Sequence, residues 1–375
     1  MKCHGMPMPN SRIYNKQHGL ALVLMLFLMA TVSLLAIAMQ SRQALDVEQA
    51  GATFEIGQAQ LIALSAEDFA KAGLTTDAKF DESQNELMDN VSELWNSEQF
   101  KGIPLGPAQV SISIRDLQGL FNLNSMAPGA PDVASAVKRF ERLLAELQLD
   151  SGVAQRVKDF MDKESQASYT YQGFDPAYSA SGLPFAHPSE LRLVDGVDNK
   201  FYETIEPYVA ALPVAAPLNV NTTPAQVLAA WDAKMDLSSA EKALDKAKSA
   251  GCEASARANT GFKTVQEFWD QQEIQNYAAP KKEDGEGGNA GDGEQDSDAA
   301  SEDSENTAQG WAQADFDVKS SFFSVMIQAQ IDERKVVLES IIKRDTNKEA
   351  GFIGVIYRDF SRKVHDMERL KIKPC

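Results

Sequence analysis

The stretch NKQHGLALVLMLFLMATVSLLAIAMQSRQ, residues 15–43, contains twenty consecutive uncharged and mostly apolar residues, from 20 to 39. A helix of this length spans about 30 Å, the thickness of the hydrocarbon core of a bilayer. Three basic residues and no acidic residue precede it. This charge bias keeps the N-terminus in the cytoplasm and sends the rest of the chain across the membrane. We therefore predict a transmembrane helix over residues 20–39.

The helical pattern continues beyond the apolar segment. Apolar residues recur at roughly helical spacing among polar ones: Leu45, Ala52, Ile56, Ala59 and Ala63. The alternative is a cleaved secretory signal, because Ala-Ile-Ala at 36–38 fits a small-x-small cleavage site. The apolar run is longer than the usual core of a signal, so the pattern favours one long helix, half in lipid and half outside.

The net charge of −18 is concentrated in one segment, since residues 283–306 hold ten acids and no base. Such a composition cannot bury enough apolar surface to offset the entropy of ordering, so we predict a disordered acidic loop over residues 281–309. A solvated linker is the simpler role, and a docking site for a cation or a partner is the alternative. The acidic balance argues against nucleic acid as a partner, because binding the phosphate backbone needs clustered Lys and Arg.

Few residues are suited to redox chemistry or catalysis. Of three cysteines, Cys252 and Cys375 lie outside the N-terminal tip. An oxidising compartment would permit a disulfide between them, and two unpaired thiols are the alternative. Serine, histidine and aspartate all occur, but no nucleophile motif places them together, so we expect no enzyme.

Alternating apolar and polar residues predict strands at both ends of the remaining chain. The segments are QVSISIRD (109–116), SFFSVMIQAQI (321–331), KVVLESIIKR (335–344) and FIGVIYRDF (352–360). Together they predict a small antiparallel sheet that packs on the long helix, which is an α+β fold. The residues between the first and second strands, about 120–315, are mostly helical and interrupt this fold as an inserted domain.

Helix-start signals recur within the inserted domain. Asp132 precedes an amphipathic segment as a predicted N-cap, and capping boxes are predicted at Thr223–Gln226, Ser238–Glu241 and Thr264–Glu267. A similar motif occurs twice, as FNLNSM at 121–126 and LNVNTTP at 218–224, and each copy places two asparagines before the following helix. We expect these asparagine side chains to tie a bend of the backbone to the free amides of the next helix.

This set of motifs resembles the K-type minor pseudopilins of bacterial type II secretion systems. A basic tip that ends in glycine directly before an apolar helix resembles a type IV prepilin leader. Further matching segments follow in the family's order: SRQALD (41–46), IRDLQGLFNLNSM (114–126), FMDKE (160–164), SELRLVDGV (189–197), YVAALP (208–213) and LNVNTTPAQVLAAW (218–231).

The resemblance implies a pseudopilin fold, a long N-terminal helix on a small antiparallel sheet, interrupted by a large inserted helical domain. The expected division is a leader (1–19), a transmembrane helix (20–39), the helix continuation with the first strand (40–119), the inserted domain (120–315) and the C-terminal antiparallel strands (316–375).

The resemblance also implies how the N-terminus is processed. A prepilin peptidase is expected to cut between Gly19 and Leu20, and Leu20 is expected to be N-methylated. Filament-forming pilins carry glutamate at the fifth mature position, where this chain has Leu24. A carboxylate there would be costly in lipid, and in the family it meets the N-terminal amine of a neighbour. Its absence suggests a subunit at the end of a filament, with Leu24 in the membrane part of the interface.

Family members can bind calcium near a loop of carboxylates. The corresponding region here is residues 160–178, in which Asp162, Glu164 and Asp175 would supply oxygen ligands. Pro176 stands where the family has its second acid. The alternative is therefore a loop of solvated acids without a cation, and no other cofactor is expected.

By resemblance, the chain is a single-pass inner-membrane protein with its bulk in the periplasm. It is expected to cap the pseudopilus tip with other minor pseudopilins and to initiate the filament that the major pseudopilin extends, for export of folded proteins. Two alternatives remain: a soluble secreted protein or hydrolase cleaved after Ala38, and a type IV pilus minor pilin acting in adhesion or DNA uptake.

Overall fold

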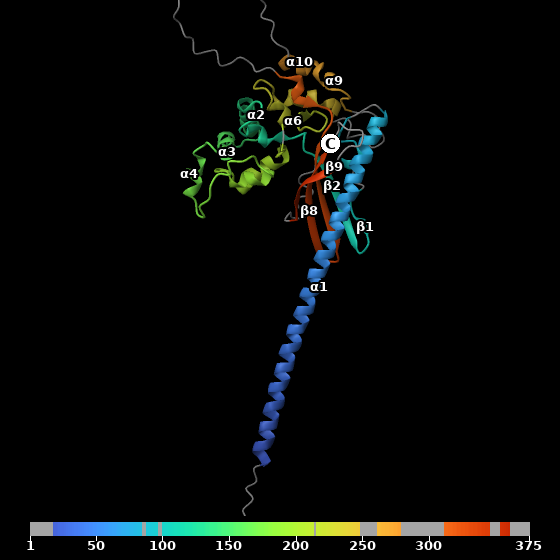
Figure 1. Cartoon of the computed structure of the whole chain (residues 1–375), viewed down its shortest axis with the longest axis vertical. Coiled ribbons are helices and arrows are strands. Elements are labelled where there is room, and N and C mark those ends of the chain that lie inside the picture. The colour runs from blue at the N-terminus through green and yellow to red at the C-terminus, as the bar shows by residue number, and fades with distance from the viewer. Residues whose placement is uncertain are drawn as a thin grey trace, which may run out of the picture. The chain divides into compact units, whose positions relative to one another are not determined.

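The computed structural model describes residues 18–84, 88–96, 100–213, 215–247, 261–278, 311–345 and 353–360. The chain divides into two compact units, residues 1–58 and 59–375. The described part of unit 1 is helical throughout and belongs to helix α1 (His18–Gln84), which also supplies the first helical residues of unit 2 (Figure 1). Proline is absent from this segment, so no residue interrupts the helical hydrogen bonds.

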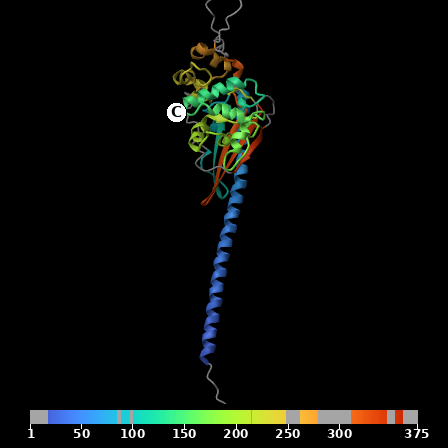
Figure 2. The same ribbon diagram turned by 90° about the vertical axis from the view of Figure 1, so that its left-hand side faces the viewer.

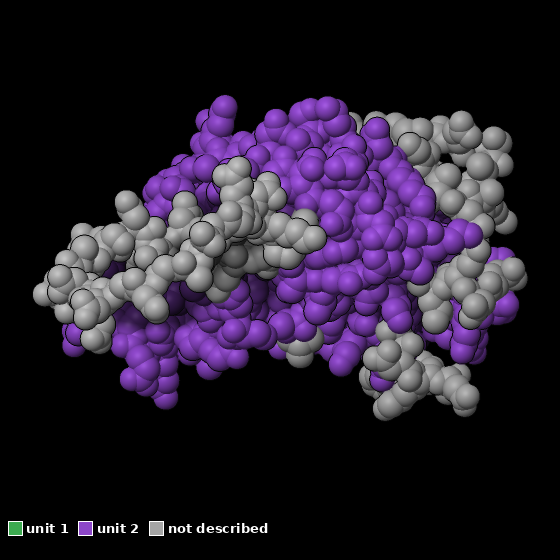
Figure 3. All heavy atoms as spheres, turned by 90° about the horizontal axis from the view of Figure 1, so that it is seen from above, with its two compact units in different colours: residues 1–58 green, residues 59–375 purple. Residues whose placement is uncertain are grey.

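Unit 2, shown as purple spheres in Figure 3, is built on a five-stranded sheet in which all pairs are antiparallel. Its order is β1 (Ile103–Leu105), β2 (Ala108–Asp116), β7 (Phe322–Ile331), β8 (Arg334–Arg344) and β9 (Ile353–Asp359). The four predicted strands and the α+β class are confirmed. The sequence did not reveal β1, because a three-residue strand that contains a proline is too short to show alternation.

One face of the sheet packs against α1. Small side chains on the helix allow close approach of its backbone: Ala59, Ala63, Ala66 and Ala70 are buried there with Leu74. They meet the apolar side chains that β2, β7 and β8 direct to this face, such as Ile112, Val325 and Leu338. The apolar stripe predicted from the sequence therefore has two environments, since Ala59 and Ala63 are buried on the sheet while Leu45 and Ile56 are exposed.

Residues 117–321, here called the insertion, connect β2 to β7 and cover the second face of the sheet (Figure 2). Their first half contains α2 (Val133–Glu146), α3 (Val153–Met161), α4 (Ala167–Gln172) and α5 (Asn199–Ile205), with the 3₁₀ helices η3 (Leu123–Met126) and η4 (Pro188–Leu193). Their second half contains α6 (Ala225–Ala229), α7 (Leu237–Ala243), α9 (Val265–Trp269) and α10 (Gln272–Ala278).

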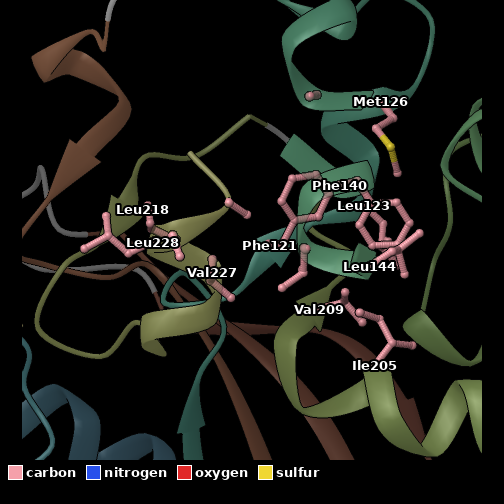
Figure 4. Close-up of a cluster of buried hydrophobic side chains, with 14 of the residues drawn as sticks. Phe121, Leu123, Met126, Phe140, Leu144, Ile205, Val209, Leu218, Val227 and Leu228 are labelled. Atoms are coloured by element: carbon pink, nitrogen blue, oxygen red, sulfur yellow. The ribbon is translucent and has the colours of Figure 1, made fainter. Parts of the chain in front are cut away.

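Each half of the insertion is closed by a short parallel strand pair. β3 (Phe121–Asn122) pairs with β4 (Val209–Ala210), and β5 (Leu218–Asn219) pairs with β6 (Phe316–Asp317). The two halves share one apolar core, in which Phe121 stacks on Phe140 with ring centroids 5.1 Å apart (Figure 4).

Two of the four predicted helix starts are confirmed. Asp132 caps α2 by accepting from Ser135 N, and Thr264 caps α9 by accepting from Glu267 N. The predicted cap at Ser238 is wrong, because Asp236 lies earlier and its carboxylate accepts from Ser239 N. The predicted cap at Thr223 is also wrong: Pro224 is the N-cap residue of α6, and no side chain caps that helix.

Candidate functional site: the N-terminal helix and the contacts around it

The apolar segment at the start of α1 is a candidate membrane anchor. Among the described residues, α1 is the one helix long and apolar enough to cross a membrane, and the most apolar part of it has no buried residue. Its large side chains are exposed, with Leu24 at 61%. A helix that is apolar all round and has no protein packed on it is suited to lipid.

Several predicted site residues lie at the edge of the described chain or beyond it. Gly19 and Leu20 are in the first turn of α1, and the leader before them lies outside the described residues. Cys252, Cys375 and the acidic segment 283–306 also lie outside. Cleavage after Gly19, the role of Leu24 and the disulfide remain predictions.

In unit 2, a buried carboxylate holds α1 on the sheet. Glu67 is 1% exposed and accepts a hydrogen bond from Ser340 Oγ of β8 at 2.6 Å. Arg358 of β9 donates to the same carboxylate through Nε at 2.9 Å and Nη2 at 2.7 Å. Burial acts to raise the pKa of Glu67, but the hydrogen bonds from Arg358 and Ser340 outweigh it and lower the pKa.

A second buried carboxylate lies where the insertion leaves the sheet. Asp116, the last residue of β2, accepts from Asn219 Nδ2 at 2.9 Å, Thr222 Oγ1 at 2.5 Å and Ser320 Oγ at 2.6 Å. Burial raises its pKa to about 6, although these hydrogen bonds act against the rise. Asp116 therefore joins β2 to both the beginning of the second half of the insertion and its return to β7.

The first asparagine of each repeated motif makes the predicted local bond, since Asn122 accepts from Asn124 N and Asn219 accepts from Asn221 N. The second asparagine of each motif makes long-range contacts that the sequence does not predict. Asn124 exchanges hydrogen bonds with the backbone of Phe185 and donates to Leu212 O. In the second copy, Asn221 exchanges the same pair of hydrogen bonds with the backbone of Phe262. The equivalent asparagine thus fixes a distant loop in each half of the insertion.

The structure brings together a serine, a histidine and a glutamate that the sequence does not place in any motif. His187 Nδ1 lies 2.8 Å from Ser189 Oγ, and His187 Nε2 lies 3.4 Å from Glu339 Oε2. His187 Nδ1 also accepts from Ser189 N and caps η4, so the imidazole serves the backbone there. His187 is 5% exposed, and its ring stacks on Tyr357 of β9. This arrangement fastens the insertion to the second face of the sheet.

A groove of about 630 Å³ runs along α1 in unit 2 and is here called the α1 groove. Its apolar wall is formed by Phe69, Phe80, Trp95, Phe100, Ile112 and Ile114. Phe69 and Phe80 are 56% and 64% exposed, so the groove presents apolar surface to its surroundings. Such grooves bind apolar side chains of polypeptides or ligands.

Two carboxylates that line the α1 groove, those of Asp77 and Glu93, lie together with the buried carboxylate of Asp89. Single oxygens of Asp77, Asp89 and Glu93 are all within 4.8 Å of one another. Arg344 donates to both oxygens of Asp89, at 2.5 and 2.6 Å. Burial raises the pKa of Asp77, and burial together with the charges of Asp89 and Asp77 raises the pKa of Glu93 well above its usual value. Of the three acids, it is Asp89 that Arg344 hydrogen-bonds, so the cluster becomes negative and attracts cations when Asp77 and Glu93 also ionise.

The three predicted calcium ligands are not brought together in this way. Asp162 follows α3 and accepts from Glu164 N at 2.9 Å, while Glu164 and Asp175 are exposed. Among the described residues, the cluster of Asp77, Asp89 and Glu93 is the one group of three acids with oxygens this close. Calcium binding by Asp162, Glu164 and Asp175 remains a prediction.

Comparison with known proteins assigns the chain to a family. Residues 119–214 and 218–285 match two family models, both described as type II secretion system (T2SS), protein K. The type II secretion system protein K of Pseudomonas aeruginosa is 30% identical over 270 residues, which is 67% of this chain and 76% of that protein. Its counterpart in Klebsiella pneumoniae is 31% identical over 280 residues, which is 70% of this chain and 81% of that protein.

A solved structure has a similar fold. It is a chain in the crystal structure of the GspK-GspI-GspJ complex from the type 2 secretion system of enterotoxigenic Escherichia coli. The TM-score is 0.62 and the identity 22%, with 84% of this chain and 100% of that chain covered. The likeness confirms the predicted pseudopilin fold. The chain belongs to the type II secretion system protein K family and is a minor pseudopilin of that secretion machine.

Proposed function

We propose that the chain is anchored in the bacterial inner membrane by residues 20–39, with its N-terminus in the cytoplasm and its bulk in the periplasm. The basic residues before the apolar segment and the acid-free leader support this orientation. Prepilin peptidase would remove the leader after Gly19, and Leu20 would become the methylated N-terminus. Mass spectrometry of the purified chain tests this: a methylated Leu20 is expected, and a chain that begins at Met39 would indicate an ordinary secreted protein.

In this proposal the chain caps the tip of the pseudopilus with other minor pseudopilins and initiates its assembly, and it acts by assembly and not by catalysis. The observation that carries the proposal is a second apolar face of α1. Val47, Phe54 and Leu61 are 72%, 72% and 67% exposed and recur every seven residues, the repeat by which helices pack side by side. The GspK-GspI-GspJ complex shows that a protein of the same fold assembles with two others. The insertion would obstruct the addition of subunits above this one.

A single charge on the exposed face tests the tip assignment. Leu61→Glu in the full chain should leave the fold intact, because the side chain is exposed, but should abolish co-purification with the other minor pseudopilins from membranes. Export of folded proteins should fail with it. Lys79→Glu, at another exposed position of α1, is the matched control. Normal complex formation and export by Leu61→Glu would refute the proposed interface, whereas loss of pilus-dependent adhesion with normal export would point to a type IV pilus.

A further inference from the structure

We propose that residues 361–375 of this chain occupy the α1 groove, with apolar side chains on its aromatic wall and basic side chains beside the carboxylate cluster. This inference does not depend on the proposed tip function. It assigns an occupant to an apolar surface and a negative cluster that lie in one place.

The groove has two chemical requirements. Phe69 and Phe80 are more than half exposed, so an occupant must bring apolar side chains to cover them. Asp77, Asp81 and Glu93 line the groove. Arg344 donates to Asp89 and Trp95 Nε1 donates to Glu93. Asp77, Asp89 and Glu93 beside one arginine nevertheless leave a net negative charge when they ionise, so an occupant gains by bringing positive charge. A segment that satisfies both needs apolar and basic residues close together.

The sequence SRKVHDMERLKIKPC at 361–375 has this composition. It holds five basic and two acidic residues in a chain whose net charge is −18. Within it, Leu370 and Ile372 alternate with Arg369, Lys371 and Lys373. In an extended conformation, such alternation places the apolar side chains on one side and the basic side chains on the other. The two sides match the aromatic wall and the carboxylates of the groove.

The strand register shows that the segment can reach the groove. Asp359, at the end of β9, is opposite Glu339 of β8, and Glu339 is opposite Met326 of β7. Met326 is opposite Ser113 of β2, whose neighbours Ile112 and Ile114 line the groove. Three strand spacings amount to about 15 Å. Fifteen extended residues span up to about 50 Å, which is enough even for a path over a helix about 10 Å across.

Zero-length cross-linking of the full chain in detergent micelles tests the proposal. A carbodiimide joins a carboxylate to a lysine amine in direct contact with it, and mass spectrometry identifies the linked peptides. We expect peptides containing Asp77, Asp81 or Glu93 to be joined to Lys371 or Lys373 within a single chain. The link between Lys246 and Glu267, whose side chains lie 2.8 Å apart on the surface, is the internal positive control.

Variants separate docking from simple charge attraction. Replacing Leu370 and Ile372 with serine keeps both lysines but removes the apolar contacts, so the linked peptides should be lost. Lys335→Gln, at an exposed position of β8, is the matched control and should leave them unchanged. Formation of the control link without any link to the groove would overturn the proposal. Links found only between two chains, or only to another protein, would assign the groove to a different occupant and would also overturn it.

Discussion

Replacement of Glu67 by glutamine tests how α1 is held on the sheet. The substitution keeps the size of a side chain that is 1% exposed, but an amide presents N–H groups where the carboxylate accepted from Ser340 and Arg358. At least one N–H of the glutamine amide then faces a donor group of Ser340 or Arg358. Hydrogen bonds to charged groups contribute about 1.5–3 kcal/mol each. Because the Arg358 side chain is 43% exposed and screened by water, we expect a total loss of only ~2 kcal/mol in the free energy of unfolding at pH 7.

The dependence of this loss on pH identifies the charge as its cause. The folded protein lowers the pKa of Glu67, since the contacts of Arg358 and Ser340 outweigh the effect of burial. A carboxylate with a lowered pKa stabilises the fold at pH values above its unfolded pKa of about 4.3, and this stabilisation is lost as the pH falls through the folded value. Glutamine does not titrate. The difference between wild type and variant should therefore be largest near neutral pH and shrink in acid.

Urea unfolding of the full chain in detergent micelles, followed by tryptophan fluorescence, measures this difference. Trp95 reports on the relevant core, because its ring packs 5.7 Å from that of Phe323. Asp68→Asn changes the neighbouring acid, whose side chain is 74% exposed, and should alter stability by less than about 0.5 kcal/mol. The reasoning would be refuted if the free energy of unfolding of the wild type were no larger than that of Glu67→Gln, or if the difference were the same at pH 4 and pH 7.

Three further predictions concern the insertion. A Cβ at Gly119 would lie 2.4 Å from Thr222 Oγ1 and 2.8 Å from the Thr222 carbonyl, so Gly119→Ala should lower the thermal midpoint, whereas Gly57→Ala, with nothing within 4 Å, should not. Burial raises the pKa of Asp116 to about 6, so its ionisation costs stability as the pH rises from 4 to 6. Relative to Asp116→Asn, which cannot ionise, the wild type should lose about 2 kcal/mol of unfolding free energy over that range, and a constant difference would contradict this. Calcium bound by Asp162, Glu164 and Asp175 should raise the thermal midpoint of the full chain above that measured in EDTA, and Asp162→Asn should remove the rise; equal midpoints would count against the site.

The sequence predicted the elements whose pattern is local. The strands β2, β7, β8 and β9 follow from period-two alternation, and α2 follows from its apolar face and Asp132. Helix starts were less certain to predict, because several polar residues near a helix compete for the same free amides. Asp236 replaced the predicted Ser238 for this reason.

The residues of the candidate site show more clearly which features cannot be predicted from the sequence. Glu67 stands beside Asp68 in an ordinary helical sequence, yet the first is buried and the second is exposed. The available signal was its position beside Ala66 and Ala70 on the stripe that packs on the sheet. Ser340 and Arg358, which make that position tolerable for a charge, lie more than 270 residues away. No spacing rule connects residues so far apart.

The sequence by itself determined the long N-terminal helix with its candidate membrane anchor, the small antiparallel sheet, the inserted helical segment and the family. These follow from hydropathy, periodicity and short motifs, which act between neighbours in the chain. Only the tertiary structure decided which acids are buried, how Asp116 joins the insertion to the sheet and where a groove remains beside α1. Those features depend on contacts between segments far apart in sequence, because the cost of burying a charge is set by whatever packs around it.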